Sequence, residues 1–202
     1  MSPAQTFERV YLAIKQRLCG GVYKPGTRID PTLLSDELNA SITPVREALH
    51  RLTGERLVET PRHDGFRMPV MTETMLRQLY AWHLDLLLLA VMKHRTVRNG
   101  EPALIDQRSG QSADERVNQI FRLLAKRAGN PELSLVLHSL AERLAPVQRI
   151  EKAFLDGTEK ETDEIVAALR THDRKSLRKS LVRYHRRREQ IIPELLAALL
   201  AG

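Results

Sequence analysis

The chain has 202 residues, of which 42% are hydrophobic and only 4% aromatic, enough for one sizeable core or two modest ones. Its formal net charge of +7 and its isoelectric point of about 9.8 favour a polyanionic partner, although charge alone identifies none. A single cysteine excludes an intrachain disulfide and a cysteine-cluster zinc site, and it fits a reducing compartment.

The sequence also argues against a membrane protein. No uninterrupted apolar run is longer than the seven residues of LLLLAVM at 86–92, which is far shorter than the roughly 20 residues that span a bilayer. No positively charged and then apolar leader opens the chain. We therefore expect a soluble, cytoplasmic protein with no membrane partner.

The first two predicted helices lie at residues 6–19 and 31–38. Apolar side chains recur at helical spacing in both segments. Asp30 and Pro31 have the order of an N-cap followed by a proline in the first helical turn. Asn39 can adopt the left-handed conformation that ends a helix, and the segment between the two helices has the composition of a turn.

A third helix and a wing follow. Thr43 can cap this helix with its hydroxyl, and Pro44 fits the first helical position, where a backbone N–H would have no partner. Strand-like apolar residues then flank the turn sequence RHDG and predict a hairpin with a basic tip; they are Leu57, Val58, Phe66 and Val70. Residues 1–71 are therefore predicted to form a winged helix-turn-helix domain.

Everything after about Thr72 has a helical pattern. The predicted helices cover residues 72–98, 113–128, 131–155, 158–171 and 173–200. We expect residues 72–202 to form an all-helical domain. The predicted fold class is therefore mainly α: an N-terminal winged helix-turn-helix with a small β-hairpin wing, followed by a helical bundle.

The third helix has the polarity of a helix that reads DNA. Its apolar residues share one face, and Arg46 and His50 lie on the other. A helix in the major groove keeps one face in the core and presents polar side chains, mainly from its first turns, to bases and phosphates. Arg46 is placed to contact a guanine edge in bidentate fashion. The predicted DNA-binding residues are Arg28, Thr32, Ser41, Ile42, Thr43, Pro44, Arg46, His50, Arg51, Arg62, His63 and Gly65. The alternative is the solvated face of a small packing helix.

The segment VYLAIKQRLCGGVYKPGTRIDPTLLSDELNASITPVREALHRLTGERLVETPRHDGF resembles the winged-helix domain of the GntR family of bacterial transcription regulators, most specifically at TPVREALHRL. The helical remainder resembles the FCD effector domain of the FadR-like branch, at FRLLAKRAGNPEL, ETDEIVAAL and RYHRR. The resemblance implies a homodimeric regulator, with repression as the expected mode, that binds double-stranded operator DNA. It also implies that residues 72–202 bind a small effector, an organic acid or related metabolite, and dimerise the protein.

Two positions depart from the family pattern on the DNA side. Family members commonly carry an arginine where this chain has Ile42, and often another where it has Thr32. We therefore expect an operator that differs from the usual family half-site. Arg46 should carry an unusually large share of base recognition.

Many FCD domains hold a divalent metal. The resemblance implies that the positions of the metal ligands in those domains correspond to Asn118, Arg122, Thr162 and His185 in this chain. Only His185 keeps a ligand side chain, and an arginine has no free lone pair for a metal, so we expect no metal and no other cofactor. Arg122 can instead pair with a carboxylate effector. The predicted effector-binding residues are His83, Asn118, Arg122, Thr162 and His185. The alternative, a vestigial pocket in which Arg122 pairs internally or reaches solvent, stays open.

The histidines are scattered without ligand spacing and the lone cysteine has no His/Asp partner in the pattern, so we expect no enzyme. Residues 170–189 hold nine Lys/Arg against two Asp/Glu, which is typical of a solvated helix face, with a second DNA contact or an acidic partner as alternatives. The stronger rival is a DNA-binding protein whose helical domain only dimerises.

Overall fold

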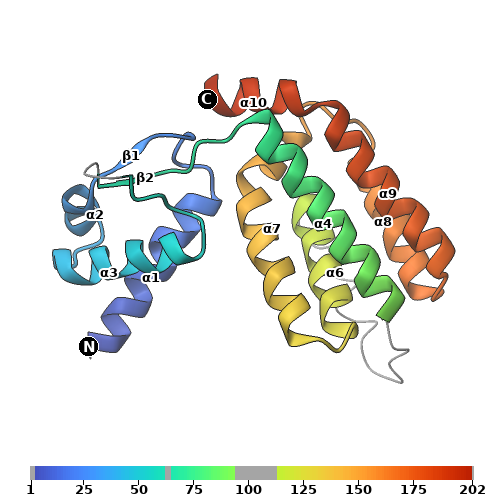
Figure 1. The fold of residues 1–202 in the computed structure, drawn as a ribbon, viewed down its shortest axis with the longest axis horizontal. Helices are drawn as coiled ribbons and strands as arrows, with labels where there is room; N and C mark the ends of the chain where they lie inside the picture. Colours follow the sequence, from blue (N-terminus) through green and yellow to red (C-terminus); the bar gives the residue numbers. More distant parts are fainter. Residues whose placement is uncertain (1–2, 62–64, 94–112, 202) are drawn as a thin grey trace. The chain divides into compact units, whose positions relative to one another are not determined.

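The computed structural model describes residues 3–61, 65–93 and 113–201 (Figure 1). The chain divides into two compact units. One takes in the residues up to Thr72 with the segments Glu142–Arg149 and Leu196–Gly202, and the other takes in Glu73–Ala141 and Ile150–Leu195. We refer to the part up to Thr72 as the N-terminal unit and to the second as the helical unit.

The N-terminal unit contains a trihelical core. Its elements are α1 (Pro3–Cys19), β1 (Arg28–Ile29), α2 (Pro31–Glu37), α3 (Ile42–Gly54) and β2 (Phe66–Arg67). Helix α3 packs against both α1 and α2 (Figure 1). The buried apolar residues are Val10, Tyr11, Ile14, Leu18, Ile29, Leu34, Leu38, Val45, Ala48, Leu49, Leu52, Leu57, Val58, Phe66 and Met68.

Side chains fix both ends of α2. Asp30 caps α2 by accepting a hydrogen bond from the Thr32 amide at 2.8 Å, as its sequence predicts. Asn39 adopts the left-handed conformation with φ 47°, which confirms its predicted role after α2. Arg9 on α1 donates to the carbonyl of Leu38 at 2.9 Å and so satisfies an otherwise unpaired group at the C-terminus of α2.

The predicted cap of α3 is wrong by two residues. The N-cap is Ser41, with φ −69° and ψ 158°, and its hydroxyl makes no capping hydrogen bond. Thr43 is the second and Pro44 the third residue of the helix. Proline is tolerated there because the first four N–H groups of a helix have no intrahelical partner in any case.

The wing is built from different strands than predicted. β2 pairs in antiparallel register with β1, Arg28 opposite Arg67 and Ile29 opposite Phe66. The predicted first strand of the hairpin contributes only a single bridge, between Glu59 and Arg67. A two-residue strand such as β1 is too short to show an alternating pattern, so the sequence identifies it only as part of a turn.

The helical unit is a bundle. The helices after Thr72 are α4 (Glu73–Lys93), α6 (Ala113–Arg127), α7 (Pro131–Glu151), α8 (Thr158–Arg170), α9 (Arg174–Gln190) and α10 (Ile192–Ala201). Of these, Glu142–Arg149 of α7 and the part of α10 from Leu196 belong to the first unit. Helix α9 packs on α4 and α8, and α6 also packs on α4 and α8, so these four helices close a ring around one core (Figure 1). Among the described helices, none is long and apolar enough to cross a membrane.

The last predicted helix, 173–200, is two helices. The break falls at Ile191, because Pro193 has no N–H to donate and its ring would clash with the carbonyl of Glu189 in a continuous helix. That carbonyl instead accepts a hydrogen bond from Arg77 on α4 at 3.0 Å. The proline therefore both ends α9 and frees a group that ties α9 to α4.

Candidate nucleic-acid interface and effector site

Helix α3 has one buried and one exposed face. Its inward residues Val45, Ala48, Leu49 and Leu52 are all fully buried. Arg46 and His50 are exposed on the other side. The His50 ring also meets the Phe66 ring of β2 edge-on, with centroids 4.9 Å apart, so the wing strand supports this side of the helix.

The first turn of α3 is open to solvent. Ser41, Ile42 and Thr43 are all exposed, and the Ser41 hydroxyl is not used to cap the helix. The first N–H groups of the helix lack intrahelical partners and carry the positive end of the helix dipole. This end of α3 can therefore accept a phosphate through backbone N–H groups and the serine hydroxyl.

Two arginines of α3 have different surroundings. The guanidinium of Arg51 lies 4.0 Å from the centroid of the Tyr11 ring, and it is 3.6 Å from Glu8 and 3.5 Å from Glu55. Arg51 therefore leans onto α1. Arg46 forms no ion pair with the part of the chain that the structure describes, so its guanidinium is available to another molecule.

The other predicted DNA-binding residues lie around the same helix-turn-helix and wing. Arg28 on β1 and Thr32 on α2 are exposed. Gly65 has φ +66°, and a Cβ there would meet nothing within 4 Å, so the backbone of the wing is open on that side. Arg62 and His63 lie outside the described residues.

Two of the predicted effector residues meet inside the helical unit. The Nδ1 atom of His83 on α4 and the Nε2 atom of His185 on α9 are 3.0 Å apart. The Nδ1 atom of His185 is 2.8 Å from the Leu181 carbonyl, which can only accept, so this nitrogen carries the proton. Nε2 of His185 is then the acceptor, and Nδ1 of His83 donates to it.

Both histidines are neutral at physiological pH. Burial lowers the pKa of His83 to about 4. Burial, with His83 as a further cause, lowers the pKa of His185 well below its usual range. Nε2 of His83 is therefore a bare acceptor, and it is buried with no hydrogen-bond partner among the described residues.

Aromatic rings fill the space around the two histidines. The Phe121 ring meets the His83 ring at 5.1 Å, and the Tyr184 ring lies 5.4 Å from Phe121 and 5.1 Å from His185. All of these side chains are buried. The centre of the bundle is therefore packed with rings.

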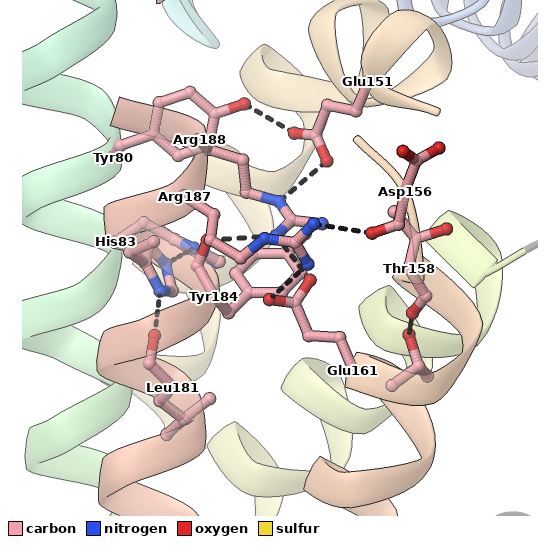
Figure 2. A network of polar contacts seen from close by, with 12 residues as sticks. Tyr80, His83, Glu151, Asp156, Thr158, Glu161, Leu181, Tyr184, Arg187 and Arg188 are labelled. Atoms are coloured by element: carbon pink, nitrogen blue, oxygen red, sulfur yellow. Dashed lines mark hydrogen bonds and ion pairs between the residues drawn. The ribbon is translucent and has the colours of Figure 1, made fainter. Parts of the chain in front are cut away.

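A buried ion network adjoins this cluster (Figure 2). Nε of Arg188 donates to Glu151 at 2.8 Å, and its Nη1 donates to Glu161 at 2.6 Å. The guanidinium carbon lies 3.3 Å from the Tyr184 ring centroid, and Tyr80 donates to the other Glu151 oxygen at 2.6 Å. The sequence did not predict this network. The spacing of Arg188, four residues after Tyr184 and seven after Leu181, does place it on the apolar side of α9.

The remaining predicted effector residues do not join the histidine pair. Thr162 is buried, and its hydroxyl donates to the carbonyl of Thr158 at 2.9 Å. Asn118 and Arg122 line a pocket between α6 and α7. Arg122 is exposed, so its side chain does not join the two histidines in the bundle centre.

The residues at the four positions of the family metal site do not fit a divalent ion. Arg122 has no lone pair, the Thr162 hydroxyl is engaged with the backbone, and both ring nitrogens of His185 are already hydrogen-bonded. Within residues 3–61, 65–93 and 113–201, no three His, Cys, Asp or Glu side chains are grouped as a metal site requires.

Known proteins match the chain at both levels, sequence and fold. Residues 6–68 match the bacterial regulatory proteins of the gntR family. The HTH-type transcriptional regulator McbR of Escherichia coli K12 is 28% identical over 187 residues, which cover 83% of this chain and 84% of McbR. The Nta operon transcriptional regulator of Aminobacter aminovorans is 41% identical over 58 residues, 29% of this chain and 28% of that protein.

Solved structures share the fold. Escherichia coli McbR/YncC superposes with a TM-score of 0.68 at 22% identity, covering 94% of this chain and 97% of that one. A putative transcriptional regulator GntR from Rhodococcus sp. RHA1 superposes with a TM-score of 0.76 at 20% identity, covering 93% and 97%. These matches confirm the predicted fold class, and the proteins named here are regulators rather than enzymes. Over residues 6–68, the chain is therefore similar to the gntR family of bacterial regulatory proteins.

Proposed function

We propose that the chain is a transcription repressor that binds operator DNA as a homodimer, with α3 of each subunit in the major groove. The observation that carries this proposal is the guanidinium of Arg46, which has no ion-pair partner among the described residues and is presented by a helix whose other face is completely buried. Groove-reading helices have this combination of a fixed core face and unpaired polar side chains near the N-terminus. Exposed Ser41 and Thr43 in the first turn support phosphate contacts beside it.

The same proposal assigns residues 1–71 to DNA binding and 72–202 to an FCD-type domain for dimerisation and sensing. One short recognition helix reads few bases, and two related by a symmetry axis read a longer, palindromic site. The effector is a small, carboxylate-bearing metabolite bound without a metal. Such a regulator acts in the cytoplasm, where its operator lies.

The second candidate function is a repressor or architectural DNA-binding protein whose helical unit only dimerises. The packing of Phe121, Tyr184 and the two histidines at the bundle centre favours it, because rings occupy the space where an effector would bind. The two candidates differ in whether a metabolite changes the affinity for DNA.

Selection of bound duplexes from a random pool, with the purified full chain, tests the proposal. We expect enrichment of an inverted repeat, and weaker enrichment by Arg46→Ala. If no sequence is enriched even at low ionic strength, the chain is not a sequence-specific regulator. Adding a panel of organic acids to the complex then separates the candidates: a change in operator affinity supports a sensor, and no change with any acid supports the dimerising role.

A further inference from the structure

A pocket of about 470 Å³ lies between α6 and α7 in the helical unit. Its walls are mostly carbon. The lining residues are Asn118, Phe121, Arg122, Ala125 and Lys126 on α6, and Pro131, Ser134, Leu135, Leu137, His138 and Ala141 on α7. This size lies within the range of about 300 to 1,000 Å³ that is typical of small-molecule sites.

The charges at this pocket have one sign. Arg122 and Lys126 are one helical turn apart on α6, both are exposed, and neither pairs with a carboxylate among the described residues. No aspartate or glutamate is present among the lining residues. An apolar wall with two unpaired cations at its edge complements a molecule with an apolar body and an acidic head group.

We propose that the α6–α7 pocket binds an amphipathic carboxylate, with Arg122 as the main partner of the carboxylate and Lys126 as a second cation. This inference deepens the proposed sensing function and rests on it. The apolar body lies against Phe121, Leu137 and Ala141.

The bundle centre is the less suitable place for this ligand. Among the described residues, the buried arginine beside the ring cluster is Arg188, which is already paired with Glu151 and Glu161, and a carboxylate would have to displace them. His83 is neutral there and offers only a lone pair, which repels a carboxylate. Arg122 pairs with no carboxylate among the described residues, and its guanidinium is a cation with N–H donors for a carboxylate.

Phe121 joins the pocket to the centre. Its side chain lines the pocket, and its ring contacts His83 of α4 and lies 6.2 Å from the His185 ring of α9. A ligand that moves this ring therefore acts on the contact between α4 and α9. Helix α4 begins directly after the last residue of the N-terminal unit, Thr72.

Ligand-observed NMR with the full chain tests the proposal, with octanoate as the probe and octanamide as its neutral counterpart. We expect octanoate to bind at least about tenfold more tightly than octanamide, because only the carboxylate pairs with Arg122. Arg122→Met is expected to remove most of this difference. The matched control is Arg178→Met, which removes an exposed arginine from α9 and is expected to leave both affinities unchanged.

A second variant tests the apolar wall. Ala141→Phe fills the pocket and is expected to weaken both probes about tenfold or more, whereas Ala167→Phe on the exposed side of α8 leaves them unchanged. Circular dichroism and urea midpoints confirm that the variants fold. The inference is overturned if octanoate affinity survives both pocket variants. It is equally overturned if His83→Leu alone abolishes binding, or if Ala141→Phe changes the oligomeric state, which would make the pocket a subunit interface.

Operator binding by the same preparation keeps this inference separate from the proposed function. If the wild-type chain selects an operator but binds octanoate no better than octanamide, the pocket assignment fails and the regulator stands. If it binds octanoate as described but selects no DNA sequence, the proposed function fails and the sensing role goes with it.

Discussion

His83 on α4 and His185 on α9 share one hydrogen bond of 3.0 Å inside the helical unit. The proton of His185 is directed at the Leu181 carbonyl, so the pair has one arrangement of protons and both rings are neutral. Protonation of either ring places a buried positive charge next to the other ring. The positive charge of Arg188 is a further cause of the low pKa of His185. The contact between α4 and α9 therefore depends on pH.

Acidification should destabilise the protein through His83. Its pKa is about 4 in the folded chain, against about 6.5 in an unfolded chain, so between these values only the unfolded state binds the proton. Stability is then lost as the pH falls, by about 2 kcal/mol for this group between pH 7 and pH 5. Urea unfolding at the two pH values measures the loss, which should shrink by about that amount in His83→Leu.

An exposed histidine serves as the control for this measurement. His172 lies in a left-handed turn with φ 54°, a conformation that asparagine also tolerates. His172→Asn is the comparison variant, because it removes an exposed imidazole and leaves the buried histidine pair in place. An unchanged pH dependence in His83→Leu would show that the buried pair does not control acid stability.

Arg188→Met should strongly destabilise the helical unit. The substitution leaves Glu151 and Glu161 buried without their shared cation, and breaking one side of a buried ion pair typically costs about 3 to 5 kcal/mol. Arg183→Met is the matched control on the same helix, since its ion pair with Glu164 is exposed and contributes about 1 kcal/mol or less. Urea denaturation of both variants gives the comparison. Similar losses in the two would contradict a special role for the buried network.

Arg46→Ala and Arg51→Ala should have opposite profiles. Removal of Arg46 is expected to lower the preference for the selected operator over random duplex by about 1 to 3 kcal/mol, with little effect on stability. Removal of Arg51 should lower stability by roughly 1 kcal/mol, since its cation lies over the Tyr11 ring, and should change the preference much less. Binding titrations and thermal melts separate the two effects. An equal loss of operator preference in both variants would show that Arg51 also contributes to DNA recognition.

Ser41→Ala should weaken DNA binding without weakening the fold. Its hydroxyl makes no capping bond, so the loss of stability should be well below the roughly 1 kcal/mol expected for a working N-cap. Asp30→Ala provides that comparison, because Asp30 does accept the Thr32 amide. The assignment of Ser41 to a phosphate contact fails if Ser41→Ala binds the operator with wild-type affinity and salt dependence.

Several features of the fold depend only on a few neighbouring residues, so they could be predicted from the sequence. The cap at Asp30, the left-handed Asn39 and the two-faced pattern of α3 depend only on residues within one or two turns. Pro193 carries the same kind of local information, because a proline in the interior of a helix kinks or breaks it. The pattern of apolar residues continues past it, so that pattern alone predicts one helix over residues 173–200 instead of α9 and α10.

Contacts between residues that are far apart in the sequence could not be predicted from any local pattern. His83 and His185 are 102 positions apart, and Arg188 and Glu151 are 37 apart, so no window of sequence indicates that they meet. The strand β1, the attachment of Arg51 to α1 and the separation of Arg122 from the histidine pair likewise depend on how distant elements pack. Helical periodicity predicts which residues share a face of one helix, but the partner of that face is set by the packing of the whole unit.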